Sequence, residues 1–574
     1  MNIRWAKGFS VLFSFFVLWA WGQYRPEGVG FWQELKAKRW VNKTYRNLTQ
    51  DEKLGQLFIV ALYTNKGEAS IEDVRVLVEE ESIGGLILMQ DDAVRHIELL
   101  NEFQKRSRVP MMVGMDAEWG LYQRIATAHK WPWAITLGAI RDKALITEMA
   151  SKIAEDAKRM GVNWDFAPVV DVNTNPENPI IGNRSFGSEV DNVTLSAEAY
   201  VKGLQQNKVL AAIKHFPGHG DTSVDSHHDL PVVAHSLARL QAVELAPFRR
   251  LISGNQGVGG VMVAHLYVPA LEKGKDLPAS ISPSIITGVL KKEMGYKGLI
   301  ITDALNMGAV AKRYRPGELD AMAFKAGNDL MLFSEGVKEG KRLIQAAIDS
   351  KELSPKRLEE SVKKVLRTKY FLGLDRYEPR TVENIHKDLN NESHKVLNRK
   401  LYANALTLLK DEKKMLPLKA DETYYYVPLE EAPHEILAAQ LGQGVRLVFR
   451  AASEVSTIPE GAKVIVGVHK DNSTAYKSYR ISEESKAVLK QLAAKHDVLL
   501  TVFGSPYALR DVNLEQCSTV LVAYENNEDA MRAAAGGLLG RTPVKGRLPV
   551  SINSEWKAGA GILLGDFVEN KMTN

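Results

Sequence analysis

The feature that most constrains the fold is an alternation of short apolar runs with helix-like stretches between residues 57 and 333. Segments with helical periodicity, such as Ala144–Met160 and Leu237–Leu251, lie between most of the runs. The eight runs are Leu57–Leu62, Gly85–Met89, Pro110–Met115, Trp164–Val169, Val209–Ile213, Gly260–Ala264, Gly298–Ile301 and Asp329–Phe333. Because parallel strands need a crossover between them, this pattern predicts eight βα units. Eight units predict a closed (β/α)8 barrel of the TIM type, and an open doubly wound sheet is the alternative.

A second, smaller alternation follows a charged stretch that begins at Arg376. Its apolar runs are Tyr424–Leu429, Val445–Phe449, Val464–Val468, Val498–Phe503 and Val520–Tyr524. Helical segments flank them at Pro433–Leu441, Glu483–Lys495 and Asp529–Leu539, which predicts an open sheet with helices on both faces. The sequence therefore predicts an α/β protein with a TIM-like barrel over residues 23–375, a linker over 376–400 and an αβα sandwich over 401–574.

Composition narrows the function classes. The 574 residues are 45% hydrophobic and 25% charged, which is globular composition and excludes a polytopic membrane protein. The net charge is +5 and the basic residues are scattered, so no nucleic acid partner is expected. Cys517 is the only cysteine, which excludes an intrachain disulfide and a zinc ribbon.

The first 22 residues have the pattern of a secretory signal peptide. Arg4 and Lys7 precede an apolar run from Phe9 to Trp21, and small residues in Ala20–Gly22 suit cleavage before Gln23. The expected location is therefore periplasmic or extracellular, with no stable membrane span once the signal is removed. An uncleaved N-terminal anchor is the alternative.

Polar residues stand where the inferred barrel strands end. Because parallel strands present their carboxyl ends at one mouth of a barrel, these side chains are expected to converge on one pocket. They are Asp116 after the third run, Asp171 beyond the fourth, Lys214 and His215 at the fifth, His265 at the sixth and Asp303 at the seventh.

The densest group of titratable residues is the loop from Lys214 to His228, which holds several histidines and two aspartates among prolines and glycines. A metal-dependent barrel hydrolase has to be weighed, since such enzymes commonly bring ligands from several strands. The first run, however, ends in Ala61–Thr64 without a ligand. No metal and no other cofactor is therefore predicted. His219 and Asp221, flanked by glycines, suit a role in fixing the loop.

Several motifs make the chain resemble the β-N-acetylglucosaminidases of glycoside hydrolase family 3. The signature is Lys-His-Phe-Pro-Gly-His-Gly-Asp-Thr-x-x-Asp-Ser-His from Lys214 to His227. The resemblance extends to Asn183–Gly187 and Ile301–Met307 in the first part of the chain. It also covers Asn404–Lys410 and Gly546–Val550 in the second part.

The resemblance implies a retaining glycosidase in which Asp303 is the nucleophile. Such an enzyme forms a covalent glycosyl-aspartate that water then hydrolyses. This subfamily uses a histidine as acid/base, which matches His227, with Asp225 as its orienting partner. His228, outside the motif, is the rival candidate.

Sugar-binding residues carry over by position, and the chain departs from the pattern at one place. Where many relatives have Asp-x-Glu-Gly-Gly, this chain has Trp119 in the fourth position, and Trp131 and Trp133 follow nearby. Their indoles form either an aromatic platform for a sugar face or part of the core. The residues that match sugar-binding positions are Asp116, Arg124, Arg184, Lys214 and His215.

The expected function is exo-acting hydrolysis of terminal GlcNAc β-glycosides, with a peptidoglycan fragment as the expected substrate. A β-glucosidase and a GlcNAc phosphorylase are alternatives with the same chemistry. From other classes, the metal-dependent hydrolase and a wall-binding module without activity remain. The sequence does not specify an oligomeric state.

Overall fold

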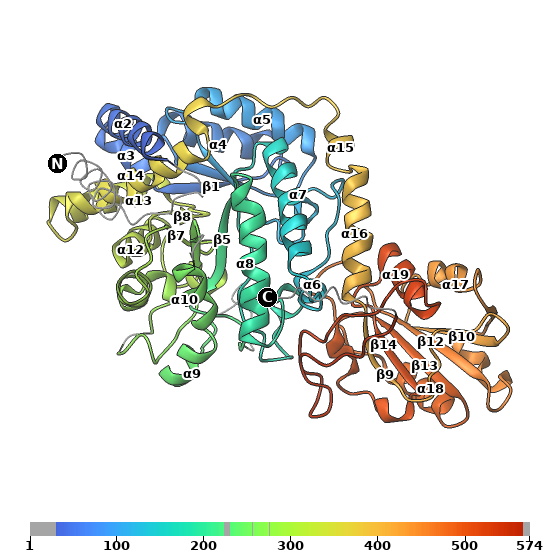
Figure 1. Cartoon of the computed structure of the whole chain (residues 1–574). Helices are drawn as coiled ribbons and strands as arrows, with labels where there is room; N and C mark the ends of the chain where they lie inside the picture. Colours follow the sequence, from blue (N-terminus) through green and yellow to red (C-terminus); the bar gives the residue numbers. More distant parts are fainter. Residues whose placement is uncertain (1–29, 223–229, 255–256, 275, 566–574) are drawn as a thin grey trace, which may run out of the picture. The chain divides into compact units, whose positions relative to one another are not determined.

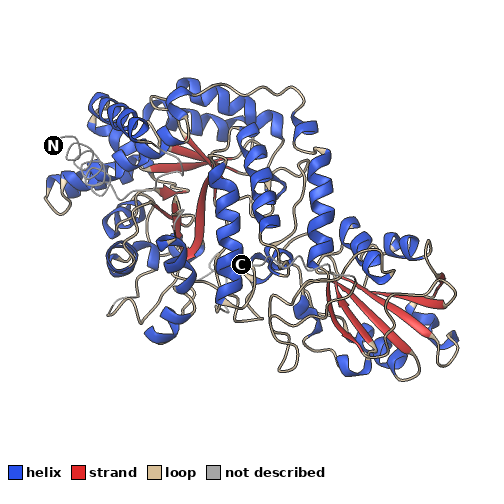
Figure 2. Cartoon of the chain, in the orientation of Figure 1, coloured by secondary structure: helices blue, strands red, loops and turns tan. Residues whose placement is uncertain are grey.

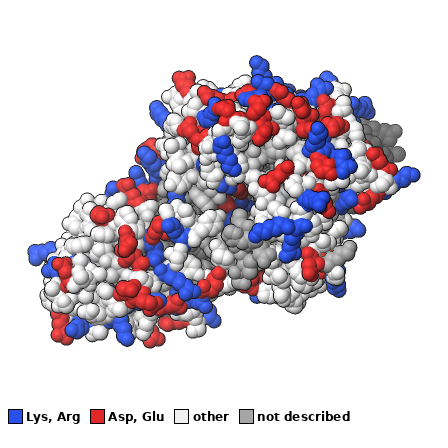
Figure 3. Space-filling view, turned by 180° about the vertical axis from the view of Figure 1, so that it is seen from behind, with Lys and Arg blue, Asp and Glu red and all other residues white. Residues whose placement is uncertain are grey.

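A computed structural model describes residues 30–222, 230–254, 257–274 and 276–565. The chain divides into two compact units. The first contains Met1–His129, Ala150–Val170 and Tyr200–Leu389, and the second contains Lys130–Met149, Asp171–Ala199 and Asn390–Asn574. Among the described residues, no helix is both long and apolar enough to cross a bilayer. On the face drawn in Figure 3, basic and acidic side chains are interspersed over most of the surface.

The first unit is built on an eight-stranded sheet in the order β7-β6-β5-β4-β3-β2-β1-β8, and every pairing within it is parallel. A parallel bridge between Ile301 and Leu330 joins the two outer strands and closes the barrel. The strands are β1 (Phe58–Leu62), β2 (Gly85–Leu88), β3 (Met112–Met115), β4 (Trp164–Asp165), β5 (Leu210–Phe216), β6 (Gly260–Val263), β7 (Leu299–Thr302) and β8 (Met331–Leu332). The predicted α/β fold with a TIM-like barrel is confirmed, and the open sheet is excluded.

Helices lie outside the barrel strands, as Figures 1 and 2 show. The longer ones are α2 (Phe31–Asn47), α4 (Glu68–Glu80), α5 (Ala93–Arg106), α7 (Ala144–Met160), α8 (Val190–Gln206), α12 (Glu318–Ala326), α13 (Val337–Asp349) and α14 (Pro355–Phe371). The shorter ones include α3 (Gln50–Gly55), α9 (Leu237–Ala242), α10 (Ala246–Ser253) and α11 (Gly308–Ala311), and a π-helical segment covers Ser284–Glu293. Helix α6 (Ala134–Gly138) belongs to the second unit. The single helix expected over Leu237–Leu251 is two helices, because Pro247 lies in the first turn of α10, which begins at Ala246.

Large apolar side chains fill the barrel interior, so the barrel is a packed core and not a pore. Trp164 and Phe166 lie edge to face with ring centroids 5.1 Å apart. Ile59, Met112 and Ile301 belong to the same buried cluster. Such a core gives the strand ends a rigid support on which polar side chains are held.

The second unit contains a six-stranded sheet in the order β11-β10-β12-β13-β14-β9, visible in red in Figure 2. Its strands are β9 (Thr407–Asp411), β10 (Thr423–Leu429), β11 (Arg446–Phe449), β12 (Lys463–His469), β13 (Asp497–Phe503) and β14 (Thr519–Val522). Its helices include α16 (Glu392–Ala405), α17 (Glu435–Leu441), α18 (Glu483–Ala493) and α19 (Glu528–Leu538), and α15 (Ile385–Asp388) precedes α16 along the chain. β9 is antiparallel to β14 and was not among the predicted strands, and α16 begins inside the segment assigned to the linker.

Candidate active site

A buried lysine joins two carboxylates where β3 and β5 end. Lys214 Nζ lies 2.9 Å from Asp116 Oδ1 and 2.8 Å from Glu118 Oε1, and its side chain is only 2% exposed. Arg124 Nη2 donates to Asp116 Oδ2 at 2.5 Å. The structure thus brings three of the predicted sugar-binding residues into direct contact. Glu118, for which no role was predicted, is the fourth member of this cluster.

This arrangement keeps Asp116 ionised. Burial alone would raise the pKa of Asp116, but the charges of Lys214 and Arg124 lower it well below its ordinary value. The Asp116 side chain remains 20% exposed, so its carboxylate can still reach a ligand. A fixed, ionised carboxylate of this kind is suited to accept hydrogen bonds from sugar hydroxyl groups.

Asp165, at the end of β4, supports the segment that carries Asp116, and no sequence motif pointed to it. Its Oδ1 accepts a hydrogen bond from the Ala117 amide at 3.1 Å, and the Tyr200 hydroxyl donates to Oδ2 at 3.4 Å. Burial raises the pKa of Asp165 to about 8, an effect that the charge of Lys214 only partly offsets. Asp165 is therefore protonated at neutral pH and holds the segment that carries Asp116.

We expect Asp165→Asn to flatten the dependence of stability on pH. A free aspartate loses its proton near pH 4, so from about pH 4 to about pH 8 wild-type Asp165 binds a proton only in the folded state. The free energy of unfolding of the wild type therefore falls as the pH rises through this window. The asparagine side chain stays uncharged throughout, so by about pH 8 the variant gains a few kcal/mol of stability relative to the wild type. Urea unfolding at about pH 5 and about pH 8 measures the difference. An equal loss of stability at both pH values would contradict the assignment.

The predicted nucleophile, Asp303, directly follows β7. Its backbone N–H donates to Val263 O at 2.8 Å, and its Oδ1 accepts from the Ala304 amide at 2.8 Å. Burial would raise the pKa of Asp303, but the charges of His215 and His265 outweigh burial and lower the pKa. Asp303 is therefore a carboxylate at neutral pH, the form that a nucleophile requires.

His265, at the end of β6, is fixed in orientation beside Asp303. Its Nε2 lies 2.9 Å from Ala304 O, and its Nδ1 lies 2.7 Å from Ser280 Oγ. Since a carbonyl only accepts, Nε2 carries the proton in this arrangement. The position of His265 at a strand end was the signal in the sequence, but no role was assigned to it there.

The histidine-rich loop after β5 is held at both of its described ends. His219 Nδ1 lies 2.7 Å from Thr222 Oγ1, and Asp221 pairs with His235 at 2.5 Å. Gly218 has φ +132°, and a Cβ there would lie 2.7 Å from Glu244 Cβ, so only glycine fits. His227 and Asp225 lie outside the described residues, as does His228.

Two predicted sugar-binding residues lie outside the Lys214 cluster: His215, at the end of β5, and Arg184, which belongs to the second unit, in the segment that follows β4. Arg184 is 7% exposed, and its Nη1 lies 3.4 Å from Ile180 O. Loops of the sandwich hold this segment through hydrogen bonds and ion pairs that the sequence did not suggest. Asn173 Nδ2 donates to the Tyr507 hydroxyl at 2.9 Å, and Asn183 Nδ2 donates to Ala475 O at 3.2 Å. The carboxylate of Glu177 pairs with Arg480 Nη2 and with Arg510 Nη1, both at 2.7 Å.

The tryptophans near the departure from the family pattern are core side chains. Trp131 and Trp133 are 0% and 1% exposed, and Trp119 is 9% exposed. So little exposed surface favours the core alternative over an open sugar platform. Among the residues that the structure describes, no group of three histidine, cysteine or acidic side chains is placed to hold a metal ion.

Comparison with known proteins identifies the family. Residues 49–368 match the model of the glycosyl hydrolase family 3 N-terminal domain, which is more than half of the chain. The chain belongs to glycosyl hydrolase family 3. This confirms the resemblance inferred from the motifs around Lys214 and Asp303.

The family 3 relatives include hexosaminidases. Beta-hexosaminidase A of Pseudoalteromonas piscicida is 32% identical over 60% of this chain, which spans 62% of that protein's length. A beta-N-acetylglucosaminidase/beta-glucosidase of Cellulomonas fimi is 25% identical over 89% of this chain and 95% of its own. The structure of a family 3 beta-N-acetylglucosaminidase from Paenibacillus sp. str. FPU-7 matches with a TM-score of 0.74 and 31% identity, covering 88% of this chain and 99% of that one.

Proposed function

We propose that this family 3 protein is a retaining, exo-acting β-N-acetylhexosaminidase that hydrolyses terminal GlcNAc β-glycosides. The observation that carries the proposal is the position of Asp303, which directly follows β7 and whose Oδ1 accepts from the Ala304 amide at 2.8 Å. The charges of His215 and His265 lower the pKa of this carboxyl group. A second support is the Lys214–Asp116–Arg124 cluster, whose charged groups suit recognition of sugar hydroxyls. The named activities of the relatives from Pseudoalteromonas piscicida and Paenibacillus favour GlcNAc as the sugar.

In the proposed mechanism, Asp303 attacks the anomeric carbon and forms a covalent glycosyl-aspartate. His227, oriented by Asp225, donates a proton to the departing glycosidic oxygen. The same imidazole then takes a proton from the water that hydrolyses the intermediate. An imidazole suits both roles, because its ordinary pKa lies near neutral pH.

The biological setting belongs to the same proposal. The predicted leader over residues 1–22 supports export to the periplasm or the exterior, and a peptidoglycan fragment is the substrate that fits such a location. A β-glucosidase is the second candidate, favoured by the double activity in the name of the Cellulomonas fimi relative.

Chromogenic substrates separate these candidates. We expect the 4-nitrophenyl β-glycoside of GlcNAc to be cleaved with a kcat/KM at least about fivefold above that of the glucoside, since lost contacts to an acetamido group cost about 1 kcal/mol or more. Activity is expected to be unchanged after treatment with EDTA. Equal turnover of the two substrates would contradict the sugar assignment, and loss of activity in chelator would favour the metal-dependent hydrolase. Formation of GlcNAc 1-phosphate in phosphate buffer would show a phosphorylase instead.

A further inference from the structure

Helix α2 carries almost the whole net charge of the protein. Five cations against the single carboxylate of Glu34 give the helix a formal charge of +4, while the complete chain has +5. Glu34 is also engaged, because both of its oxygens accept from Arg367 at 2.6 and 2.8 Å. The five cations, all exposed, are Lys36, Lys38, Arg39, Lys43 and Arg46.

Most of these cations share one face of the helix. Positions 32, 36, 39, 43 and 46 are separated by four, three, four and three residues, and this spacing aligns them in one stripe. Ala37 and Val41 lie on the other side, where they are 0% and 7% exposed. That side packs on α14, with the Trp40 and Tyr370 ring centroids 5.9 Å apart. We call the stripe the basic face of α2, and it consists of Trp32, Lys36, Arg39, Lys43 and Arg46.

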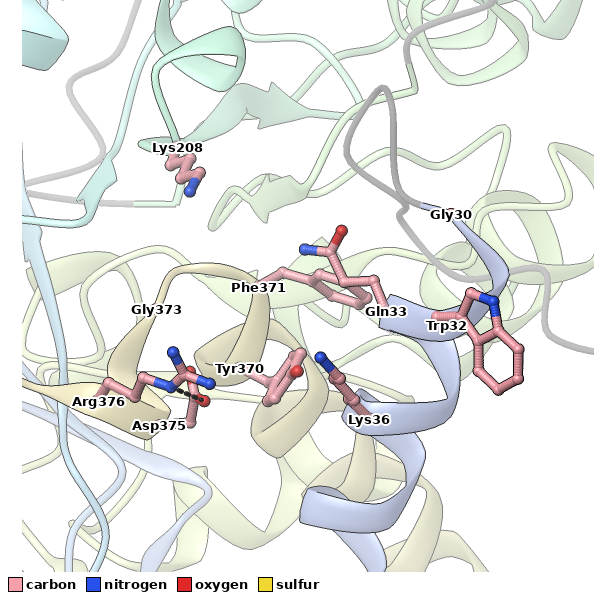
Figure 4. A pocket seen from close by; sticks show the side chains of 10 residues that line it. All are labelled: Gly30, Trp32, Gln33, Lys36, Lys208, Tyr370, Phe371, Gly373, Asp375 and Arg376. Carbon is pink, nitrogen blue, oxygen red and sulfur yellow. Dashed lines mark ion pairs between the residues drawn. The ribbon is translucent and has the colours of Figure 1, made fainter.

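An exposed tryptophan begins the basic face. Trp32 is 74% exposed, and it is one of the residues that line the neighbouring cavity, shown in Figure 4. An exposed indole is costly in water, but it is favourable at the boundary between lipid headgroups and acyl chains, where its ring is apolar and its N–H is polar. The combination of an indole with a row of cations is typical of surfaces that contact membranes.

A cavity of about 610 Å³ adjoins the first turns of α2. In Figure 4 the amino groups of Lys36 and Lys208 and the guanidinium of Arg376 turn toward it, and the aromatic rings of Tyr370 and Phe371 lie along it. Asp375 also lines the cavity, and its Oδ2 lies 3.7 Å from Arg376 Nε. Cations around an aromatic floor fit the phosphate and glycerol groups of a lipid headgroup.

We propose that the basic face of α2 and this cavity bind the surface of an anionic phospholipid bilayer. Charge complementarity supports this partner, since juxtamembrane lysine and arginine residues are attracted to anionic headgroups. The position in the chain supports it as well, because α2 follows closely after the apolar run that ends at Trp21. The surface holds the enzyme at the membrane independently of cleavage of the leader.

Vesicle sedimentation with the full chain tests the proposal. Wild type is expected to bind vesicles of equal parts phosphatidylglycerol and phosphatidylcholine more tightly than vesicles of phosphatidylcholine alone. Raising the salt from about 50 mM to about 500 mM is expected to remove this excess, because exposed charges are then screened. Lys36→Glu/Arg39→Glu/Lys43→Glu is expected to lower the partition coefficient on phosphatidylglycerol vesicles by about two orders of magnitude.

A matched control carries the same change of charge elsewhere on the first unit. Lys292→Glu/Lys297→Glu/Lys338→Glu alters three exposed lysines outside α2 and is expected to retain the excess binding. Cleavage of the aryl GlcNAc glycoside by both triple variants reports that they are folded. Trp32→Ala is expected to weaken binding severalfold.

Three results would overturn the proposal. The first is equal binding of wild type to the two kinds of vesicle. The second is an equal loss of binding in the two triple variants. The third is an affinity for soluble polyphosphate that equals, per phosphate group, the affinity for the phosphatidylglycerol vesicles. The surface would then recognise polyanions in general and not a bilayer.

Discussion

Replacement of Asp303 by alanine is expected to lower kcat/KM on an aryl GlcNAc glycoside by roughly four to six orders of magnitude, the scale seen when a covalent enzyme loses its nucleophile. The structure gives the reason, since Asp303 is a carboxylate at the end of a rigid strand, kept ionised by the charges of His215 and His265. Alanine leaves the anomeric carbon without an attacking group. Steady-state rates at several substrate concentrations, with circular dichroism to verify folding, measure the effect.

A small external nucleophile provides the control for this variant. Azide is expected to occupy the space of the missing carboxylate and to restore part of the rate, giving a glycosyl azide of inverted configuration. Azide is expected to leave the rate of the wild type unchanged. A folded Asp303→Ala variant within tenfold of wild-type activity would refute the role of Asp303.

Replacement of Lys214 by methionine is expected to affect both activity and stability. The substitution removes the positive charge that Asp116 and Glu118 share in a nearly buried setting, and losing one partner of a buried ion pair costs about 3–5 kcal/mol. We also expect kcat/KM to fall at least roughly a hundredfold, since a charged hydrogen-bonding group and the orientation of Asp116 are lost together. Urea unfolding and GlcNAc glycoside kinetics measure the two effects.

Lys341→Met separates the two effects of the Lys214 substitution. Lys341 on α13 is 3% exposed and also joins two carboxylates, Asp51 at 2.5 Å and Glu81 at 2.6 Å. Its replacement is expected to destabilise the protein while leaving kcat/KM of the folded fraction unchanged. Equal activity of the two methionine variants would show that Lys214 is structural only.

The strands of the barrel could be predicted because each is a short apolar run with a helical segment after it. Strand ends shifted by a few residues, since apolar periodicity does not mark where the last ladder hydrogen bond forms. β9 was not predicted, because it is an antiparallel edge strand and no helix follows it to mark a βα unit. The break between α9 and α10 could have been predicted from Pro247.

The site could be predicted only for residues at strand ends or in family motifs. Asp116, Lys214 and Asp303 were proposed in this way, whereas Asp165 was not, because it acts through burial next to Ala117 and Tyr200. Glu118 joins the cluster through Lys214, nearly a hundred residues later in the chain. Contacts of that sequence separation leave no local signal.

The contacts that hold the segment around Arg184 could not be predicted from the sequence either. Tyr507 and Arg510 come from the sandwich and contact Asn173 and Glu177, more than three hundred residues earlier. These contacts show that the sandwich holds the segment that carries Arg184 in place.

The most direct test of a covalent glycosyl-aspartate at Asp303 is mass spectrometry of the trapped intermediate. The enzyme would be incubated with an activated 5-fluoro GlcNAc glycoside, whose intermediate turns over slowly because fluorine destabilises the oxocarbenium-like transition state. Peptide mapping is then expected to find the added sugar mass on the peptide that contains Asp303, and on no peptide of the Asp303→Ala variant. A sugar adduct on a different residue, or turnover of the compound with inversion at the anomeric carbon, would contradict the proposed mechanism.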